Sequence, residues 1–157
     1  MEECSLQISG IKYLLQKQGW VDIPSSGVSM YPLIKEGDIC RFVPLGSKEL
    51  RKGEVVLFVS NQGQLVGHRY YDNFVENGVL YYKCKGDTNV SVDSPVKKSQ
   101  LIGKLVCIKK KKFQLNCDGF IARLWRCIVL TLPSLPRWCR KYLYLWTRLK
   151  SKQGSSL

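Results

Sequence analysis

The run Glu54-Val55-Val56-Leu57-Phe58-Val59 decides the fold class of this chain. Its five apolar residues include three β-branched ones and one aromatic one, which is typical of a strand buried on both faces. The following Asn61-Gln62-Gly63 has the composition of a hairpin turn, and residues 64–71 supply the partner strand. The sequence therefore predicts a buried antiparallel hairpin near the middle of the chain.

Short segments on both sides of this hairpin also have the composition of strands. Turn signals separate them about every ten residues, which is typical of an all-β protein. The expected strands are residues 20–23, 38–43, 79–84 and 101–108, with 101–108 as the final one. We predict a mainly β fold in which residues 20–108 form a coiled, barrel-like antiparallel sheet.

A short N-terminal helix is expected within residues 1–19. Its apolar positions form a loose helical stripe that ends at Gly19 and consists of Leu6, Ile8, Ile11, Leu14 and Leu15. The stripe predicts a helix that packs on the sheet. At about three to four turns, this segment is too short to form a helix-turn-helix DNA-binding domain.

The positive charge of the chain is concentrated in its C-terminal tail, residues 109–157. The formal net charge is +13, and residues 1–108 contribute only +2 of it, from 13 Lys and Arg against 11 Asp and Glu. The remaining +11 belongs to the tail, where Lys109–Lys112 have the composition of a solvated linker. Because the body is nearly neutral, nucleic acid is not an expected partner.

Two amphipathic helices are expected in the tail, separated by Pro133 and Pro136. In residues 120–132, Arg123 and Arg126 lie opposite Ile121, Leu124, Trp125 and Ile128. In the second helix, Arg137, Arg140, Lys141 and Arg148 lie opposite Trp138, Tyr142, Leu145, Trp146 and Leu149. Such helices are typical of a membrane interface, so an anionic membrane surface is an expected partner of residues 109–152. The alternative is that both helices fold back on the sheet and bury their aromatic residues.

The chain has seven cysteines, an odd number, and their spacing is not that of metal ligands. No CxxC pair occurs and the chain has a single histidine, so we expect no metal and no cofactor. Reduced thiols in a reducing compartment are the simplest interpretation. Neither a signal peptide nor a membrane-spanning helix is expected, which favours a cytoplasmic or peripheral membrane protein, on the cytoplasmic face.

Ser29 has surroundings that suit a nucleophile. It lies in Gly27-Val28-Ser29-Met30-Tyr31-Pro32, where the glycine lets another backbone approach closely and the proline stiffens the exit. A serine in such a segment is most often only a turn residue, and these six residues alone leave both interpretations open.

His68 is the only histidine and the side chain that could serve as a base for Ser29. Alternatively, it is a structural residue on one face of a strand, with Arg69 exposed. A base also needs an acceptor that orients its second ring nitrogen, and Asp87 and Asp93 are the candidates. Both aspartates equally suit a turn.

Taken in order, several short motifs resemble the characteristic boxes of the type I signal peptidase and LexA-type serine peptidase superfamily. They cover about residues 20–108 and are GVSMYP, GD, KGEVVLF, GHR, KGDTN followed by Asp93, and IGKL. The histidine in GHR resembles the branch of archaea and the endoplasmic reticulum, which pairs serine with histidine. The resemblance implies Ser29 as nucleophile, His68 as base, Asp93 as the third member of a triad and Asp87 as a supporting neighbour.

Two features depart from this superfamily. Many relatives carry a serine two residues before the nucleophile as an oxyanion donor, where this chain has Gly27. The backbone N–H groups of Gly27 and Ser29, or the Ser26 side chain, are expected to take that role. Classical signal peptidases also have transmembrane anchors, and none is expected here.

The resemblance implies a serine endopeptidase that removes leader or signal-like peptides from a precursor. The substrate would bind as an added β-strand, with small residues before the cut. An alternative of another class is a catalytically weak member that acts as a peptide-binding module recruited to membranes. A self-cleaving regulator of the LexA type ranks last, because that branch uses lysine as its base and no DNA-binding domain is evident.

Overall fold

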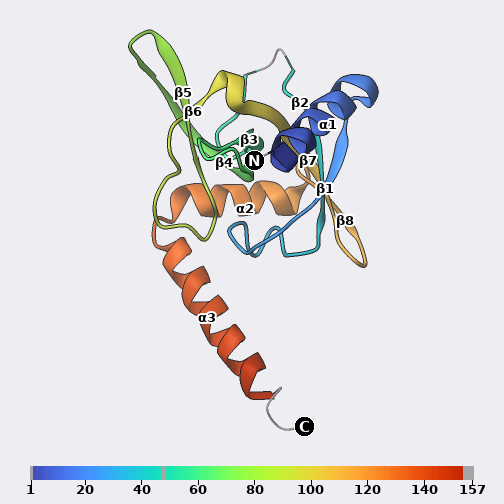
Figure 1. The fold of residues 1–157 in the computed structure, drawn as a ribbon. Coiled ribbons are helices and arrows are strands. Elements are labelled where there is room, and N and C mark those ends of the chain that lie inside the picture. The colour runs from blue at the N-terminus through green and yellow to red at the C-terminus, as the bar shows by residue number, and fades with distance from the viewer. Residues whose placement is uncertain (1, 47–48, 154–157) are drawn as a thin grey trace.

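The computed structural model describes residues 2–46 and 49–153 of the 157-residue chain (Figure 1). These residues form one eight-stranded sheet and three α-helices. The strands are β1 (Val21–Pro24), β2 (Ile39–Pro44), β3 (Val55–Val59), β4 (Leu65–Glu76), β5 (Val79–Lys85), β6 (Val96–Lys97), β7 (Leu101–Lys109) and β8 (Gln114–Asn116). The helices are α1 (Glu2–Gln18), α2 (Phe120–Thr131) and α3 (Leu135–Gln153), and a short 3-10 helix, η1 (Lys98–Gln100), precedes β7. The expected mainly β class, with helices at both ends, is confirmed.

The strands pair antiparallel in the order β1-β2-β7-β3-β4-β5-β6, with β8 added beside β7. Among the described residues, β1 and β6 end this order without pairing to each other, so the sheet is open rather than a closed barrel. The expectation that residues 101–108 form the final strand is wrong. β8 follows and places the buried Leu115 opposite Ile108. Leu115 is the one buried residue of β8 and its neighbours are polar, so the sequence pattern does not indicate a strand there.

β3 is buried on both faces, as its composition predicts, and it separates two hydrophobic cores. Val55 and Leu57 belong to the larger core, whereas Val56 and Phe58 belong to the smaller one. Alternate side chains of a strand point to opposite faces, so one short run of residues supplies both cores. Val56 lies opposite His68 of β4, which places the single histidine at the centre of the sheet.

The N-terminal helix α1 packs on the sheet through part of its predicted stripe. Leu15 is buried in the larger core, with Ile8 and Ile11 packed beside it. Leu6 departs from the expected pattern, because it is 74% exposed near the start of the helix. None of the helices in the described part of the chain is long and apolar enough to cross a membrane.

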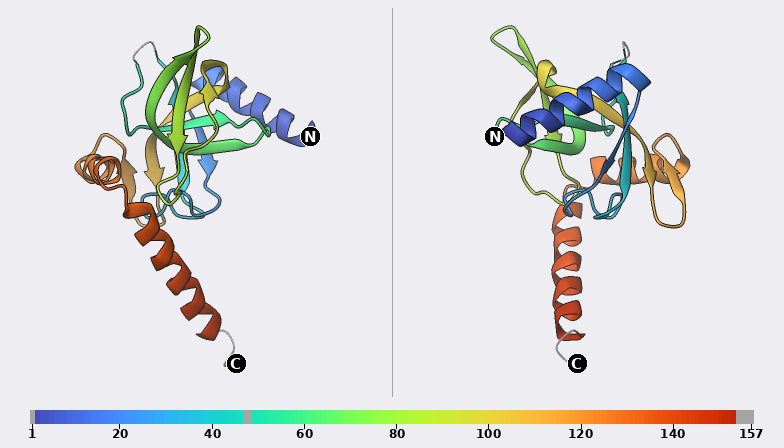
Figure 2. Two further views of the ribbon diagram at one scale, coloured as in Figure 1. Left: turned by 90° about the vertical axis from the view of Figure 1, so that its left-hand side faces the viewer. Right: turned by 45° about the vertical axis from the view of Figure 1, so that its right-hand side comes forward.

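The two C-terminal helices behave differently. α2 lies against the sheet and buries Ala122 and Val129, in the position that the fold-back alternative predicts. Its predicted apolar side is only partly covered, because Trp125 is half-buried whereas Ile121 and Leu124 are exposed. α3 instead projects from the body, and its C-terminal end lies far from the sheet (Figures 1 and 2). Trp138 and Leu145 of α3 are exposed, as expected for its apolar side. Trp146 and Leu149, predicted on the same side, lie outside the residues whose side chains are described.

A small ion-pair cluster joins β1, β2 and β7 next to the segment that carries Ser29. Asp22 of β1 accepts two hydrogen bonds from Arg41 of β2, at 2.7 and 2.8 Å, and one from Lys109 of β7 at 2.6 Å. The Arg41 hydrogen bonds, with a further contribution from Lys109, lower the pKa of Asp22 from its ordinary value of 3.8 to about 2. The ionised carboxylate therefore stabilises the edge of the sheet.

Replacing Asp22 with asparagine should lower the free energy of unfolding by about 1 to 2 kcal/mol at pH 6. The pKa of Asp22 is lower in the folded state than in the unfolded chain, so its contribution is complete above about pH 4 and is lost as the pH falls toward 2. The difference between wild type and Asp22→Asn, measured by urea unfolding, should shrink over that interval. Asp72→Asn is the control, because the Asp72–Lys52 pair is far more exposed. A constant difference from pH 6 to pH 2.5 would contradict the role of the carboxylate charge.

Candidate active site

The segment between β1 and β2, residues 25–38, carries Ser29 and is fixed where it leaves and rejoins the sheet. The Ser25 N–H donates to the Asp38 carbonyl at 2.8 Å, which closes the segment into a loop. Lys110 reaches over from beyond β7 and donates to the Asp38 carboxylate at 2.5 Å. Lys110 is thus a structural residue rather than part of a solvated linker.

The chain makes a hydrogen-bonded turn directly after Ser29. The Ile34 N–H donates to the Met30 carbonyl at 3.0 Å, and both side chains are buried in the larger core. Because buried side chains in a packed core have little freedom to move, this turn holds Ser29 at the edge of the core. The Ser29 side chain itself remains partly accessible to solvent.

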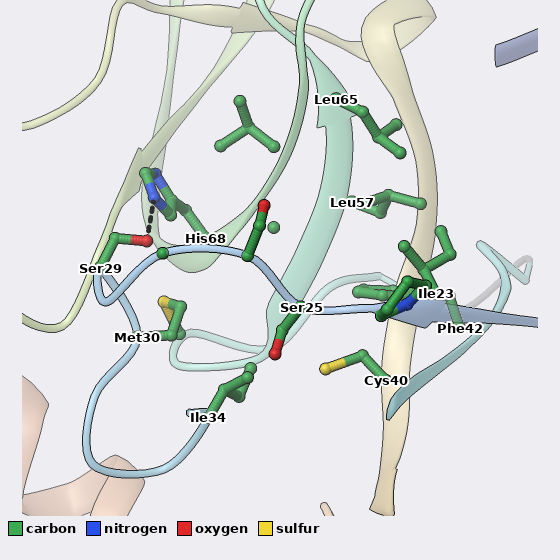
Figure 3. A pocket seen from close by; sticks show the side chains of 15 residues that line it. Ile23, Ser25, Ser29, Met30, Ile34, Cys40, Phe42, Leu57, Leu65 and His68 are labelled. Atoms are coloured by element: carbon green, nitrogen blue, oxygen red, sulfur yellow. Dashed lines mark hydrogen bonds between the residues drawn. The ribbon is translucent and has the colours of Figure 1, made fainter. Parts of the chain in front are cut away.

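Ser29, His68 and Asp93 form a continuous hydrogen-bonded series. The Ser29 Oγ atom lies 3.0 Å from His68 Nε2 (Figure 3), and His68 Nδ1 lies 2.6 Å from Asp93 Oδ2. With its ring proton on Nδ1, the imidazole donates a hydrogen bond to Asp93 and accepts one from the Ser29 hydroxyl group at Nε2. The structure brings together the three residues expected to form a triad, from the β1–β2 segment, β4 and the loop after β5.

The loop after β5 also holds the backbone of Ser29. The Thr88 N–H donates to the Ser29 carbonyl at 2.9 Å, and the Thr88 hydroxyl lies 3.2 Å from the same oxygen. Gly86 permits this approach, because a Cβ atom there would lie 2.9 Å from the Ser29 carbonyl oxygen. Residues 86–93 therefore position the serine and the histidine at once, the histidine through Asp93.

Asp87 is fully buried in this loop, at the centre of a network of hydrogen bonds. Its two carboxylate oxygens accept hydrogen bonds from Arg69 Nε and Nη2, at 2.7 and 2.6 Å, and one of them also accepts a bond from Trp125 Nε1 at 2.8 Å. The alternative interpretation of His68 as a structural residue placed Arg69 at the surface, and this is wrong, because the Arg69 side chain is 2% exposed. A carboxylate excluded from water needs a cationic partner, and Arg69 is that partner.

Trp125 is the residue of this network that sequence analysis missed. The helical pattern places it on the apolar side of residues 120–132, which predicts burial but not a partner. Its indole N–H links α2, in the C-terminal tail, to the loop that holds Ser29. The tail is thus joined directly to the support of the candidate site.

A cavity of about 420 Å³ opens beside Ser29 and His68 (Figure 3). It lies between residues 23–27 on one side and residues 65–67 of β4 on the other. Its walls are mostly apolar and include Met30, Ile34, Cys40, Phe42, Leu57 and Leu65. A second hollow of about 230 Å³ lies on the side of Asp93 and is lined by polar residues of the β3–β4 turn together with the Asp93–Val96 stretch. The candidate site therefore stands between an apolar cavity and a more polar one.

Two backbone N–H groups next to Ser29 can donate to a ligand. Among the described residues, none accepts a hydrogen bond from the amide N–H of Ser29 or of Gly27. Gly27 has φ +78°, a conformation that favours glycine, while a Cβ atom there would meet nothing within 4 Å. The glycine is thus explained by its backbone conformation, not by the close approach that the sequence suggested. Ser26 lines the cavity with an exposed side chain, whereas the Ser25 hydroxyl already donates to the Lys35 carbonyl.

The buried cysteines near the site are unsuited to nucleophilic chemistry. Burial raises the pKa of the Cys40 thiol, in the cavity wall, to about 12, and has the same effect on the Cys84 thiol beneath Asp93. A thiol with so high a pKa is protonated at neutral pH, whereas the reactive form is the thiolate. Across the described residues, no three His, Cys, Asp or Glu side chains converge as metal ligands would.

A serine hydroxyl in series with an imidazole and a carboxylate is the arrangement that serine hydrolases use. The chain is similar to signal peptidase I W of Bacillus subtilis (strain 168), with 40% identity over 47 residues. This stretch is 30% of the chain and 25% of the relative, so the chain spans about a quarter of the relative's length. No protein-family model matches. The similarity points to a relationship with signal peptidases over this stretch alone.

Replacing Trp125 with phenylalanine should lower the free energy of unfolding by about 2 kcal/mol, because a buried carboxylate loses one of its three donors. Urea unfolding of the full chain measures this effect. Leu124→Ala is the control, since Leu124 lies on the same helix but is 50% exposed, and it should change the stability by about 0.5 kcal/mol or less. Equal losses for the two variants would contradict a specific role for the indole N–H.

Proposed function

We propose that the protein is a serine endopeptidase of the signal peptidase type, with Ser29 as nucleophile, His68 as general base and Asp93 as the residue that orients the imidazole. The observation that carries this proposal is the hydrogen-bonded series of Ser29, His68 and Asp93, at 3.0 and 2.6 Å. The similarity to signal peptidase I W supports the same reaction class. Asp87 takes the supporting role, through its contacts with Arg69 and Trp125.

The proposed reaction is acyl transfer in two steps. The Ser29 oxygen attacks the carbonyl carbon of a peptide bond, and its proton moves to His68 Nε2. His68 then gives this proton to the leaving amine as the C–N bond breaks, which leaves an ester on Ser29. A water molecule, deprotonated by His68, hydrolyses the ester and restores the free serine. Asp93 stays ionised throughout and stabilises the imidazolium that forms in each step.

The charge that develops on the substrate oxygen needs donors close to Ser29. The amide N–H groups of Ser29 and Gly27 are the proposed donors, since neither is used within the described part of the protein. The exposed Ser26 side chain is a further donor at the mouth of the cavity. A preorganised donor of this kind is worth about 3 to 4 kcal/mol of transition-state stabilisation in serine peptidases.

The proposed substrate is an extended peptide within a precursor protein. An extended chain fits along the cavity beside residues 23–27 and residues 65–67, which line it and include the end of β1 and the start of β4. The apolar walls favour a small or apolar side chain on the substrate just before the cut. The similar Bacillus protein is a signal peptidase, which suggests a signal or leader peptide as the segment removed.

A comparison of protein N-termini in cells carrying wild type or Ser29→Ala tests the proposal. We expect a defined set of termini to be lost in the mutant, and the residues around them identify the cleavage motif. Ser99→Ala is the matched control, because Ser99 is exposed in η1 and lies outside the candidate site. Identical termini in all three strains would favour the alternative function, a peptide-binding module without catalysis.

Cleavage of a peptide that carries the identified motif should depend on all three residues. Ser29→Ala and His68→Ala should each lower kcat by about ten-thousandfold or more, and the double variant should be hardly worse than either, because the residues act as a unit. Asp93→Ala should cost about a thousandfold or more, since it leaves the nucleophile and base in place. Circular dichroism should show an unchanged fold for Ser29→Ala. Wild-type cleavage by Ser29→Ala would contradict the assignment of the nucleophile.

A further inference from the structure

Part of the apolar side of α3 is exposed among the residues whose side chains are described. Trp138 is 71% exposed and Leu145 is 49% exposed, although both occupy the side of the helix that its sequence pattern makes apolar. Figure 2 shows in two views that the helix extends away from the sheet. An exposed tryptophan followed two turns later by a leucine is a feature that a freely soluble helix would not need.

The opposite side of α3 is cationic. Arg137, Arg140 and Lys141 are all exposed there, and Arg148 continues the same side two turns further on. Residues 119–157 contain eight Lys and Arg and no Asp or Glu. Nothing in this part of the sequence neutralises the charge, so the surface has a strong positive potential.

The outward side of α2 adds a second apolar surface. Phe120 is 80% exposed, and Ile121 and Leu124 are exposed beside it, while Ala122 and Val129 face the sheet. Burial of Ala122 and Val129 fixes the helix, so this outward side is presented to solvent by a packed element. The name C-terminal helical surface is used below for a set of exposed residues of the two helices. They are Phe120, Ile121 and Leu124 of α2 and Arg137, Trp138, Arg140, Lys141 and Leu145 of α3.

α3 is tied to the candidate site at its first turns. The ring of Tyr142 stacks on that of Tyr31, with centroids 6.0 Å apart and an interplanar angle of 18°. Burial raises the pKa of Tyr31 above its ordinary value, and a hydrogen bond with Tyr142 adds a smaller contribution. Tyr31 lies two residues after Ser29, so whatever binds α3 is brought close to the nucleophile segment.

From these contacts, we propose that the C-terminal helical surface binds an anionic lipid membrane. A membrane interface covers the two sides of an amphipathic helix at once, the aromatic and aliphatic side chains in the acyl boundary and the Lys and Arg among anionic headgroups. RNA would neutralise the cationic side but leave the apolar side exposed. A second copy of the chain would bring two strongly positive surfaces together with no acidic residue to pair them.

Sedimentation with lipid vesicles tests the proposal on the full chain. Wild type should bind vesicles of phosphatidylcholine with about 30% phosphatidylglycerol at least tenfold more tightly than pure phosphatidylcholine, and less tightly as salt is raised. The triple variant Arg137→Gln/Arg140→Gln/Lys141→Gln should bind at least about tenfold more weakly. Trp138→Ser should also weaken binding by about tenfold, through loss of the apolar contact.

Matched variants on the body distinguish a defined surface from diffuse attraction. Lys83→Gln/Lys97→Gln/Lys98→Gln removes the same charge from exposed positions of the sheet and of η1, and Val75→Ser removes an apolar side chain that is 67% exposed. Both should bind vesicles as wild type does. The Ser29→Ala variant should too, so that lipid binding is measured independently of cleavage.

Three outcomes would overturn the proposal. The first is no preference for the anionic vesicles, and the second is an equal loss of binding in the two charge variants. The third is displacement of the protein from vesicles by RNA at concentrations well below those of the accessible lipid, which would assign the surface to nucleic acid.

Discussion

The structure depends on one fully buried carboxylate, that of Asp87. An ionised group removed from water is very costly unless it is paired, so the native fold requires the three hydrogen bonds that its oxygens accept. Arg69 comes from β4, Trp125 from α2 and Asp87 from the loop after β5. The network therefore joins three parts of the chain that are distant in sequence, and it does so directly beside the segment that carries Ser29.

This arrangement explains how the candidate site is held in place. Asp87 fixes the loop of residues 86–93, the next residue of the loop binds the Ser29 carbonyl, and Asp93 at its end binds the imidazole. Two neighbouring residues of β4 contact the two aspartates of this loop. His68 lines the cavity and binds Asp93, and Arg69 binds Asp87. Catalysis in serine peptidases relies on groups held in position before the substrate arrives, and a rigid loop with two anchored aspartates meets that need.

The C-terminal tail divides into two parts with different physical roles. α2 belongs to the folded body, because it buries Ala122 and Val129 and supplies the indole donor to Asp87. α3 contacts the body through its first turns, with Tyr142 stacked on Tyr31, and then extends into solvent. The proposed lipid contact would involve mainly α3, while α2 keeps the tail attached to the body next to the candidate site. Of the two sequence alternatives for the tail, the fold-back one describes α2, while the membrane-interface one stays a prediction for α3.

Composition and periodicity were enough to predict the strands around β3 and the helices at both ends, whereas the set of Ser29, His68 and Asp93 was predicted from the resemblance of the motifs to a known family. The strands were predictable because a run buried on both faces must be apolar throughout, and the residues at Ser29 because the chain resembles a family whose motifs occur in the same order. Strand β8, the burial of Arg69 and the contact of Trp125 were decided by the tertiary structure alone. Each depends on a partner far away in the sequence: β8 on an open edge of β7, and both Arg69 and Trp125 on one carboxylate. A local pattern records how apolar a position is, whereas the partner of a buried polar group is set only when the distant segments meet.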